Sequence, residues 1–291
     1  MKKKWNRKRT IKSQWLLLPS VLGILLFYFG PFCSMVWRSF CQNVEGAFCG
    51  LDNYIQLFQN GAFQQGAWNT LRFGVCAIFG TLFLSLFFAW GIYRLKKWGD
   101  LIQTMHLIPM VLPVTSVAMF WSLYWNKNGI CNGIMTKVGR QAVDWLGDAY
   151  AIWALIFIFI WKNMGFILLL WLIGMRSVSA SVVEAALMDG ANGWNLFFRI
   201  ILPQLRATAD TALIFLLLRV GQIFREAYIM EGDYPPEGMY LMEHTFHNWF
   251  RNYDFARLSA GACVYAAVIV SITIFLRMSG GERTKKKGRK E

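Results

Sequence analysis

The sequence predicts an all-α, polytopic membrane protein with six transmembrane helices, and three observations lead to this fold class. Apolar residues make up 56% of the chain and charged residues only 16%, against about 25% charged in a typical soluble domain. The apolar residues form runs long enough to cross a bilayer, and the basic residues gather at the two ends of the chain. A soluble protein with so few charges could not cover its surface with polar groups, whereas lipid removes that requirement.

The six apolar segments predict one helix each, because a bilayer core about 30 Å thick needs roughly 20 apolar residues. The predicted helices cover about residues 15–37, 73–93, 103–125, 149–175, 207–229 and 258–276. The first follows a basic start, as a signal peptide would, but its apolar run is too long and no small-residue cleavage pattern follows Phe29. We therefore expect a retained helix.

The loops predict the orientation by the positive-inside rule. With the N-terminus in the cytoplasm, the inner segments 1–12, 94–100, 176–206 and 277–291 hold 20 Lys and Arg residues, and the outer loops hold 4. The organisation is thus a basic cytoplasmic N-terminus at 1–14, a transmembrane domain at 15–277 and a basic cytoplasmic tail at 278–291. This predicts a multi-pass membrane protein with both termini in the cytoplasm. Basic residues confined to the chain ends, without zinc-finger spacing, argue against nucleic-acid binding.

The cysteines and histidines give no metal pattern. Cys41 and Cys49 share one outer loop, so a disulfide is possible there, although free thiols in an apolar setting are the favoured interpretation. His244 and His247 are three residues apart in another outer loop, where a solvated loop is favoured over a metal site. No metal or cofactor is expected in this chain.

The third inner loop, 176–206, is long and predicts two helices. Ser177, Ser179 and Ser181 offer N-caps for a helix over 182–188. Asp189 and Gly190 form a turn signal. Trp194, Phe197, Phe198 and Ile201 then repeat at i, i+3, i+4 and i+7, and Pro203 closes the second helix. Such an elbow, with an apolar stripe and no partner within the loop, predicts a docking surface; an interfacial helix on lipid headgroups is the alternative.

The same loop carries a family resemblance. The spacing of Glu184-Ala185-Ala186, Gly190, Ile200 and Leu202-Pro203 resembles the EAA loop of ABC importer permeases. The run Asp189-Gly190-Ala191 has the form typical of the carbohydrate-uptake branch of that family. Residues 50–54, 69–71, 108–129 and 161–166 also resemble that branch, so the resemblance covers roughly residues 10–280.

The resemblance implies a bacterial inner or plasma membrane, a mechanism and a set of partners. Two permeases pair, an extracytoplasmic binding protein delivers the sugar, and each permease presents its elbow to one subunit of a cytoplasmic ATPase dimer, where ATP-Mg binds. The residues expected to couple the elbow to the ATPase are Glu184, Ala185, Ala186, Asp189, Gly190, Ala191, Leu202 and Pro203. The chain has no GxxxxGK[ST] phosphate loop and no catalytic constellation, so it is expected to be a non-catalytic subunit.

Charged residues inside two spans point to the solute pathway, because a charge at the bilayer centre costs of order 3 kcal/mol on insertion scales. Lys162 and Arg219 lie mid-span, Asn163 follows Lys162, and Gln222 and Glu226 share a helical face with Arg219. Trp161 could stack on a sugar ring.

The alternatives for these charges are structural. Arg219 could pair with Glu226 or with the partner permease, and Lys162 could bond a backbone carbonyl. No acid is expected at matching depth, and an unpaired cationic midplane favours an anionic or hydroxyl-rich solute.

Three other functions remain open from the sequence. The same architecture could import a different solute such as glycerol phosphate, or the chain could be a secondary transporter or a membrane enzyme. The outer loop 232–238 departs from the Gly-Gly-Pro-Gly-like turn of the family, which leaves its contact with a binding protein open. One chain holds only half of the pore, so the sequence does not name the solute.

Overall fold

The computed structural model describes residues 17–43, 46–95 and 99–287, with side chains up to residue 278. The predicted basic N-terminus at 1–14 and residues 288–291 of the predicted tail lie outside the described residues. The described part is helical and contains no strand, only an isolated antiparallel bridge between Cys41 and Phe48. The chain divides into two compact units, one of residues 17–60 and 249–267 and the other of residues 61–248 and 268–287.

The first unit contains the N-terminal span and the loop that follows it. Its helices are α2 (Leu18–Ile24), η1 (Leu25–Phe29), α3 (Gly30–Arg38), α4 (Asp52–Gln59) and the first part of α16 (Phe255–Lys287). The side chains of the N-terminal span are not buried within the chain, as suits a helix that faces lipid or another subunit. Asn53 donates to the carbonyl oxygens of Ser39 and Cys41, at 2.9 Å each, and so ties the end of α3 to α4.

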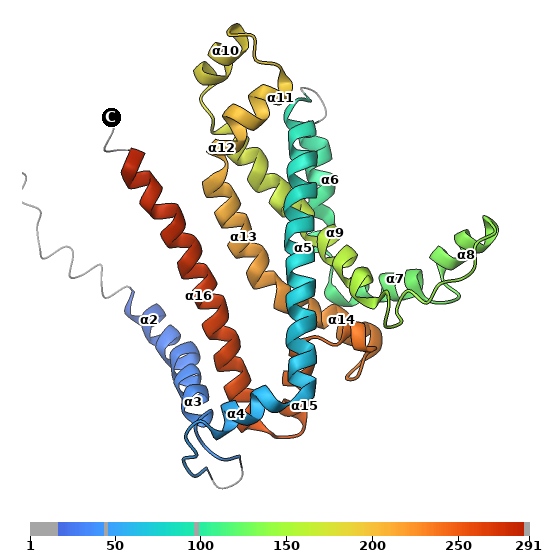
Figure 1. Ribbon diagram of the computed structural model, residues 1–291, viewed down its shortest axis with the longest axis vertical. Helices are drawn as coiled ribbons and strands as arrows, with labels where there is room; N and C mark the ends of the chain where they lie inside the picture. The colour runs from blue at the N-terminus through green and yellow to red at the C-terminus, as the bar shows by residue number, and fades with distance from the viewer. Residues whose placement is uncertain (1–16, 44–45, 96–98, 288–291) are drawn as a thin grey trace, which may run out of the picture. The chain divides into compact units, whose positions relative to one another are not determined.

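The second unit is built around α9 (Figure 1). Its elements are α5 (Gly61–Tyr93), α6 (Gly99–Val111), α7 (Val114–Trp125), α8 (Ile130–Lys137), α9 (Ala151–Arg176), α10 (Ala180–Met188), α11 (Gly193–Asn195), η2 (Leu196–Ile201), α12 (Leu202–Gln204), α13 (Arg206–Val220), η3 (Gly221–Ile223), α14 (Phe224–Glu231), η4 (Glu237–Met239) and most of α15 (Met242–Arg251). Helix α9 packs against α5, α6 and α13, and α14 packs against α7. These contacts form the apolar core of the unit.

Two features bring the core helices close together. A Cβ atom on Gly165 would lie 1.8 Å from the carbonyl oxygen of His106, so only glycine lets the backbones of α9 and α6 approach this closely. Trp171 of α9 donates its indole N–H to the Ser85 hydroxyl of α5 at 3.0 Å. This bond satisfies a polar group that would otherwise be costly inside an apolar core.

Five helices of the described residues are long and apolar enough to cross a membrane, or six if a bent pair counts as one span. The bent pair replaces the straight helix predicted over 103–125: α6 and the segment that begins with α7 meet at 95°. Pro113 stands at the start of α7 and has no N–H to continue the helix, which explains the break.

The other helix bounds differ from the predicted ones mainly in length. Helix α5 begins at Gly61, twelve residues before the predicted start, because its polar first turns are helical without being apolar enough to suggest a span. Helix α16 continues to Lys287, past the predicted end at 276. The fourth span, α9, covers Ala151–Arg176, and the fifth covers Arg206–Glu231.

The loop between α14 and α15 is fixed to α5 by side chains. Asn69 donates to the carbonyl oxygens of Glu237 and Tyr240, at 2.7 and 2.9 Å. The Thr70 hydroxyl accepts from the backbone N–H of Met242 at 2.9 Å, and the Asp148 carboxylate accepts from the N–H of Glu237 at 2.7 Å. The sequence that departs from the family pattern therefore forms an ordered loop on the end of α5.

Candidate functional sites: the elbow and the mid-span polar cluster

The elbow, residues 177–205, begins with α10 and turns sharply after it. The N–H of Ala191 bonds the carbonyl of Ala186 at 2.9 Å, and the N–H of Gly190 bonds that of Leu187 at 3.1 Å. This is the Schellman pattern, and it requires a left-handed residue directly after the helix. Gly190 has φ +80°, a conformation that an L side chain rarely adopts. The turn predicted at Asp189-Gly190 thus has a specific hydrogen-bonded form.

The helix caps of the elbow differ from those suggested by the sequence. Ser179 stands at the N-cap of α10 but makes no capping bond; its hydroxyl bonds that of Ser181 at 2.7 Å instead. The second arm is capped by Asn192, whose side-chain oxygen accepts from the N–H of Asn195 at 2.8 Å. Sequence reasoning missed this cap, although an Asn before a helical apolar run is a usual signal for one.

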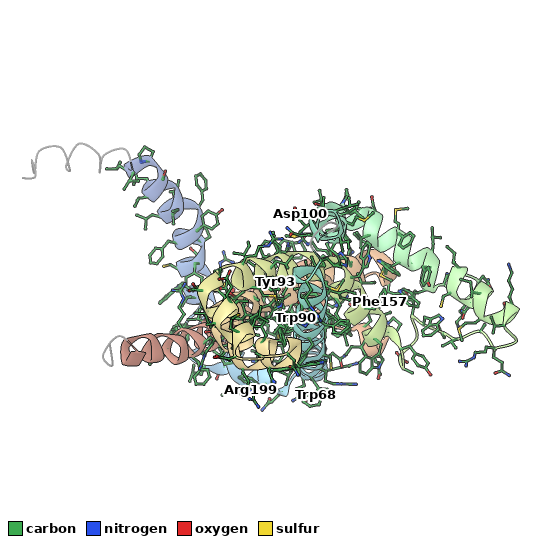
Figure 2. The ribbon with its side chains drawn as sticks, turned by 90° about the horizontal axis from the view of Figure 1, so that it is seen from above. Trp68, Trp90, Tyr93, Asp100, Phe157 and Arg199 are labelled. Carbon is green, nitrogen blue, oxygen red and sulfur yellow. The ribbon has the colours of Figure 1, made fainter. Side chains whose placement is uncertain are left out.

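The apolar stripe predicted on the second arm is divided between two faces, so only half of it is exposed and the docking role stays a prediction. Phe197 and Ile201 are buried, and the ring centroid of Phe197 lies 4.7 Å from that of Trp90, near the end of α5. Figure 2 labels Trp90 of α5 and Arg199 of the second arm. Trp194 and Phe198 are exposed and stacked, with ring centroids 5.4 Å apart. The cause is the π-helical geometry of η2, whose wider turns do not follow the α-helical period.

The elbow exposes large apolar side chains on both of its arms. They come from α10 and from the second arm, two segments that contact each other: Val182, Leu187, Met188, Trp194 and Phe198. Met188 is 88% exposed, which is unusual for a large apolar side chain. Exposed apolar surface of this kind marks interaction sites. We call these five residues the elbow patch.

The residues of the EAA motif occupy different positions around this patch. Glu184 and Ala185 are exposed, whereas Ala186 is buried against the core of the unit. Leu202 is half-buried, and Pro203 lies exposed in the first turn of α12. Asp189 is the exposed C-cap of α10.

The second site is a polar cluster in the middle of the fourth and fifth spans. Lys162 of α9 forms an ion pair with Glu226 of α14, and the Glu226 side chain is only 2% exposed. The expectation that no acid lies at the depth of Lys162 was therefore wrong. The fifth span is interrupted by the 3₁₀ turn η3, so Glu226 faces Lys162 and does not pair with Arg219.

Arg219 and Arg225 share one acceptor in this cluster. The Gln222 side-chain oxygen accepts from Arg219 Nη1 at 2.6 Å and from Arg225 Nη2 at 3.4 Å. The Arg219 guanidinium also lies over the ring of Phe215, 5.1 Å from its centroid. Sequence reasoning missed Arg225, although a basic residue within the apolar fifth segment was a signal for it.

The remaining predicted pathway residues differ in position. Asn163 is buried and donates to the carbonyl oxygen of Phe159 at 2.9 Å. Trp161 is half-buried and meets the ring of Trp121 edge-on at 5.4 Å, so it belongs to an aromatic cluster of the core. A small cleft, which we call the polar cleft, is lined by Phe159, Lys162, Asn163, Arg219, Gln222, Ile223, Arg225 and Glu226. Four of the five predicted pathway residues thus line one cleft, and Trp161 does not.

The loops predicted from the sequence to lie outside hold other polar features. The thiols of Cys41 and Cys49 are free. Burial lowers the pKa of His244 from 6.5 to about 4, and its Nδ1 accepts from the N–H of Leu241 at 3.0 Å. Among the described residues no group of three His, Cys, Asp or Glu side chains could hold a metal ion.

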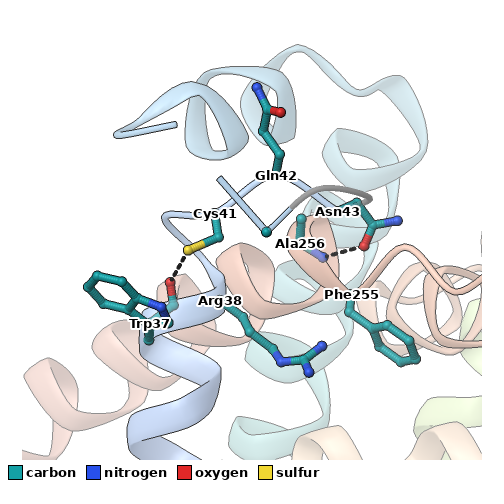
Figure 3. Close-up of a pocket in the computed structure, with 8 residues that line it drawn as sticks. Trp37, Arg38, Cys41, Gln42, Asn43, Phe255 and Ala256 are labelled. Carbon is teal, nitrogen blue, oxygen red and sulfur yellow. Dashed lines mark hydrogen bonds between the residues drawn. The ribbon is translucent and has the colours of Figure 1, made fainter. Parts of the chain in front are cut away.

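A pocket of about 330 Å³ lies in the first unit, at the end of α3 (Figure 3). Its residues include Arg38 and Asn43, and the Asn43 side-chain oxygen accepts from the N–H of Ala256 at 3.3 Å. The Arg38 guanidinium lies over the ring of Phe255, 5.9 Å from its centroid.

The fold is that of a multi-pass membrane protein, and comparison with known proteins identifies its family. The model of the family described as "Binding-protein-dependent transport system inner membrane component" matches residues 81–280. The chain belongs to this family, whose members are permease subunits of ABC importers. It is a transport component and not an enzyme, and it works with a binding protein and an ATPase.

Curated relatives and solved structures cover nearly the whole chain. The probable ABC transporter permease protein YurN of Bacillus subtilis (strain 168) is 28% identical, over 91% of this chain and 93% of its own length. The trehalose/maltose transport system permease protein MalF of Thermococcus litoralis is 28% identical, over 89% and 90%. A bacterial alginate ABC transporter, solved in complex with an alginate pentasaccharide-bound periplasmic protein, has a chain with TM-score 0.83, 21% identity and 96% coverage of both chains. That likeness shows the fold.

Proposed function

We propose that this chain forms half of the translocation pathway for a carbohydrate that an extracytoplasmic binding protein delivers. A second, homologous permease forms the other half, and a cytoplasmic ATPase dimer that binds ATP-Mg drives the cycle. The trehalose/maltose permease among the relatives supports a carbohydrate substrate. The observation that carries the proposal is the elbow patch, an apolar surface at the end of the helical core opposite the loop that Asn69 anchors.

In this arrangement the elbow and both chain termini lie in the cytoplasm of a bacterial cell. The excess of Lys and Arg in the segments 1–12, 94–100, 176–206 and 277–291 supports this orientation. The exposed apolar side chains of the spans, such as those of the N-terminal span, contact lipid or the second permease.

The elbow couples to the ATPase through two kinds of contact. The elbow patch buries apolar surface in the ATPase, and exposed Glu184 anchors α10 by charge-assisted hydrogen bonds. Ala185 keeps the exposed face of α10 thin, and Gly190 sets the angle between the two arms. Motion of the second arm reaches the core through the contact between Phe197 and Trp90.

Replacement of Trp194 by alanine tests the docking role. Trp194→Ala removes a ring that is 69% exposed and packs only on Phe198 in the described structure, so folding should be unaffected. The importer is purified from membranes through a tag on this chain, and the co-purifying ATPase is quantified. We expect at least a tenfold loss of ATPase. Glu184→Lys in the same assay should also lose ATPase.

The matched control is Trp153→Ala, which removes another exposed tryptophan, 54% exposed, from the first turn of α9. It should retain the ATPase at the wild-type level. Equal recovery of ATPase with Trp194→Ala and Trp153→Ala would show that the elbow patch does not bind the ATPase. Purification of the wild-type chain as a homo-oligomer without an ATPase would overturn the proposed function and favour a secondary transporter.

A further inference from the structure

The polar cleft has an uncompensated positive charge. It contains three cationic side chains, Lys162, Arg219 and Arg225, and one acid, Glu226. Glu226 is paired with Lys162. The two arginines therefore have no ion pair of their own among the described residues, and the one side-chain acceptor they share is the neutral oxygen of Gln222.

Arg219 has a hydrogen-bond donor that is shielded from solvent and has no partner within the described part of the chain, namely its Nε. Leaving a buried donor unpaired costs about 1–3 kcal/mol, and more for a charged group. A ligand oxygen at this position would supply the missing acceptor and remove that cost. A guanidinium matches the two oxygens of a carboxylate or phosphate group with its fork of N–H donors.

The neighbours of Arg219 hold its guanidinium in place. Its Nη1 is bonded to Gln222, and the ring of Phe215 lies against its face, so its orientation is fixed before a ligand arrives. Arg225 is exposed and reaches the same oxygen of Gln222 at the longer distance of 3.4 Å, so it is free to turn toward a second ligand oxygen. Preorganised donors of this kind give specificity at low entropic cost.

We propose that the polar cleft binds the anionic group of an acidic sugar, with Arg219 and Arg225 as its two specificity-determining residues. The proposal rests on the proposed import of carbohydrate and names the class of solute. Lys162 is not part of the anion site, because Glu226 already neutralises it. Asn163 also has a structural partner for its amide N–H groups in the carbonyl of Phe159.

Direct binding to the purified importer tests this assignment without knowledge of the natural solute. The probes are glucuronate, glucose 6-phosphate and neutral glucose, titrated by microscale thermophoresis at low salt. We expect at least one of the two charged sugars to bind tenfold or more tightly than glucose, and the stronger of the two reports whether a carboxylate or a phosphate fits. Arg219→Gln and Arg225→Gln should each abolish this preference.

The control is Arg140→Gln, which removes the same charge from an exposed loop position outside the cleft. It should retain the wild-type preference. Arg225→Gln keeps the inference testable if Arg219→Gln does not fold, because Arg225 is exposed. Equal binding of all three sugars, or a preference that survives both substitutions, would overturn the anion site. If the ATPase co-purifies with the wild-type chain but not with Trp194→Ala, the proposed function stands although the anion site has failed.

Discussion

At the elbow, Trp194 and Phe198 expose apolar rings, whereas in the middle of the spans Lys162, Glu226 and Arg219 place charges among apolar helices. Each region contains the kind of side chain that its surroundings disfavour. The elbow patch is stable because its backbone is held by the Schellman turn and by the packing of Phe197. The polar cluster is stable because the most buried charge, Glu226, is paired.

The difference lies in what supports each region. The turn of the elbow is held by hydrogen bonds between neighbouring residues, Phe197 packs it on α5, and its exposed rings contribute little to folding. The cluster joins α9 to α14 across 64 residues of chain, and its buried ion pair is part of the core. We therefore expect substitutions in the cluster to change stability, and substitutions on the elbow surface to change coupling.

The largest expected effect is that of Lys162→Met. Removing Lys162 leaves Glu226 as an unpaired buried charge, and breaking a buried pair in this way costs about 3–5 kcal/mol. Thermal unfolding of the purified importer should show a large fall in Tm. The double variant Lys162→Met with Glu226→Gln removes both charges and should recover most of the loss. A single variant as stable as wild type would show that the pair does not support the core.

A buried histidine outside both regions makes the stability of the protein depend on pH. The pKa of His244 is lowered by burial from 6.5 to about 4, so below pH 6.5 the unfolded chain binds a proton that the folded chain does not. Stability should therefore fall as the pH drops from about 6.5 to about 4, by at most on the order of 3 kcal/mol. The measurement is the Tm against pH for wild type and His244→Asn. Identical slopes of Tm against pH for the two proteins would contradict this prediction.

The crossing of α9 and α13, between the elbow and the cluster, should respond less strongly. A Cβ on Gly174 would lie 2.5 Å from the Thr208 hydroxyl and 2.9 Å from Leu205 Cδ2, so Gly174→Ala overpacks the crossing at a cost of about 1–3 kcal/mol. Gly133→Ala is the control, because its Cβ would meet nothing within 4 Å. If the Tm of Gly174→Ala equals that of the control, the two helices move apart enough to accommodate the added methyl group at no cost, and the prediction is wrong.

The smallest change in stability is expected for Gly190→Ala. Its φ of +80° makes a Cβ unfavourable by about 1–2 kcal/mol. Gly139 ends α8 with the same hydrogen-bond pattern and a φ of +78°, so Gly139→Ala should lose similar stability. Only Gly190→Ala should also lower the ATPase activity of the assembled importer. Similar ATPase losses in both variants would mean that the effect comes from strain and not from the elbow.

The sequence predicted the elbow better than the cluster, for physical reasons. The turn at Asp189-Gly190 depends on a few neighbouring residues, and left-handed glycine after a helix has a local signature. The pair of Lys162 and Glu226 depends on how two distant helices pack, which no local pattern records. The helical-face argument placed Gln222 and Glu226 beside Arg219, and all three line the polar cleft. It did not record that Glu226 pairs with Lys162 of α9.

Two other differences between the prediction and the structure had signals in the sequence. Pro113 marked the bend between α6 and α7, but apolar composition alone suggested a straight span. The π-helical turns of η2 lie just before Pro203, and the i, i+3, i+4, i+7 pattern holds only for a regular α-helix. The fold class survived both errors, because it depends on the number and length of the apolar segments.

Helix α5 joins two surfaces that the chain keeps far apart. It has 33 residues and no proline, so it is a continuous rod about 50 Å long. Asn69 and Thr70, near its start, hold the loop before α15, and Trp90, near its end, packs on the elbow through Phe197. A force applied to that loop by a docked protein therefore has a stiff mechanical path to the elbow, and a push from the elbow travels back along the same rod.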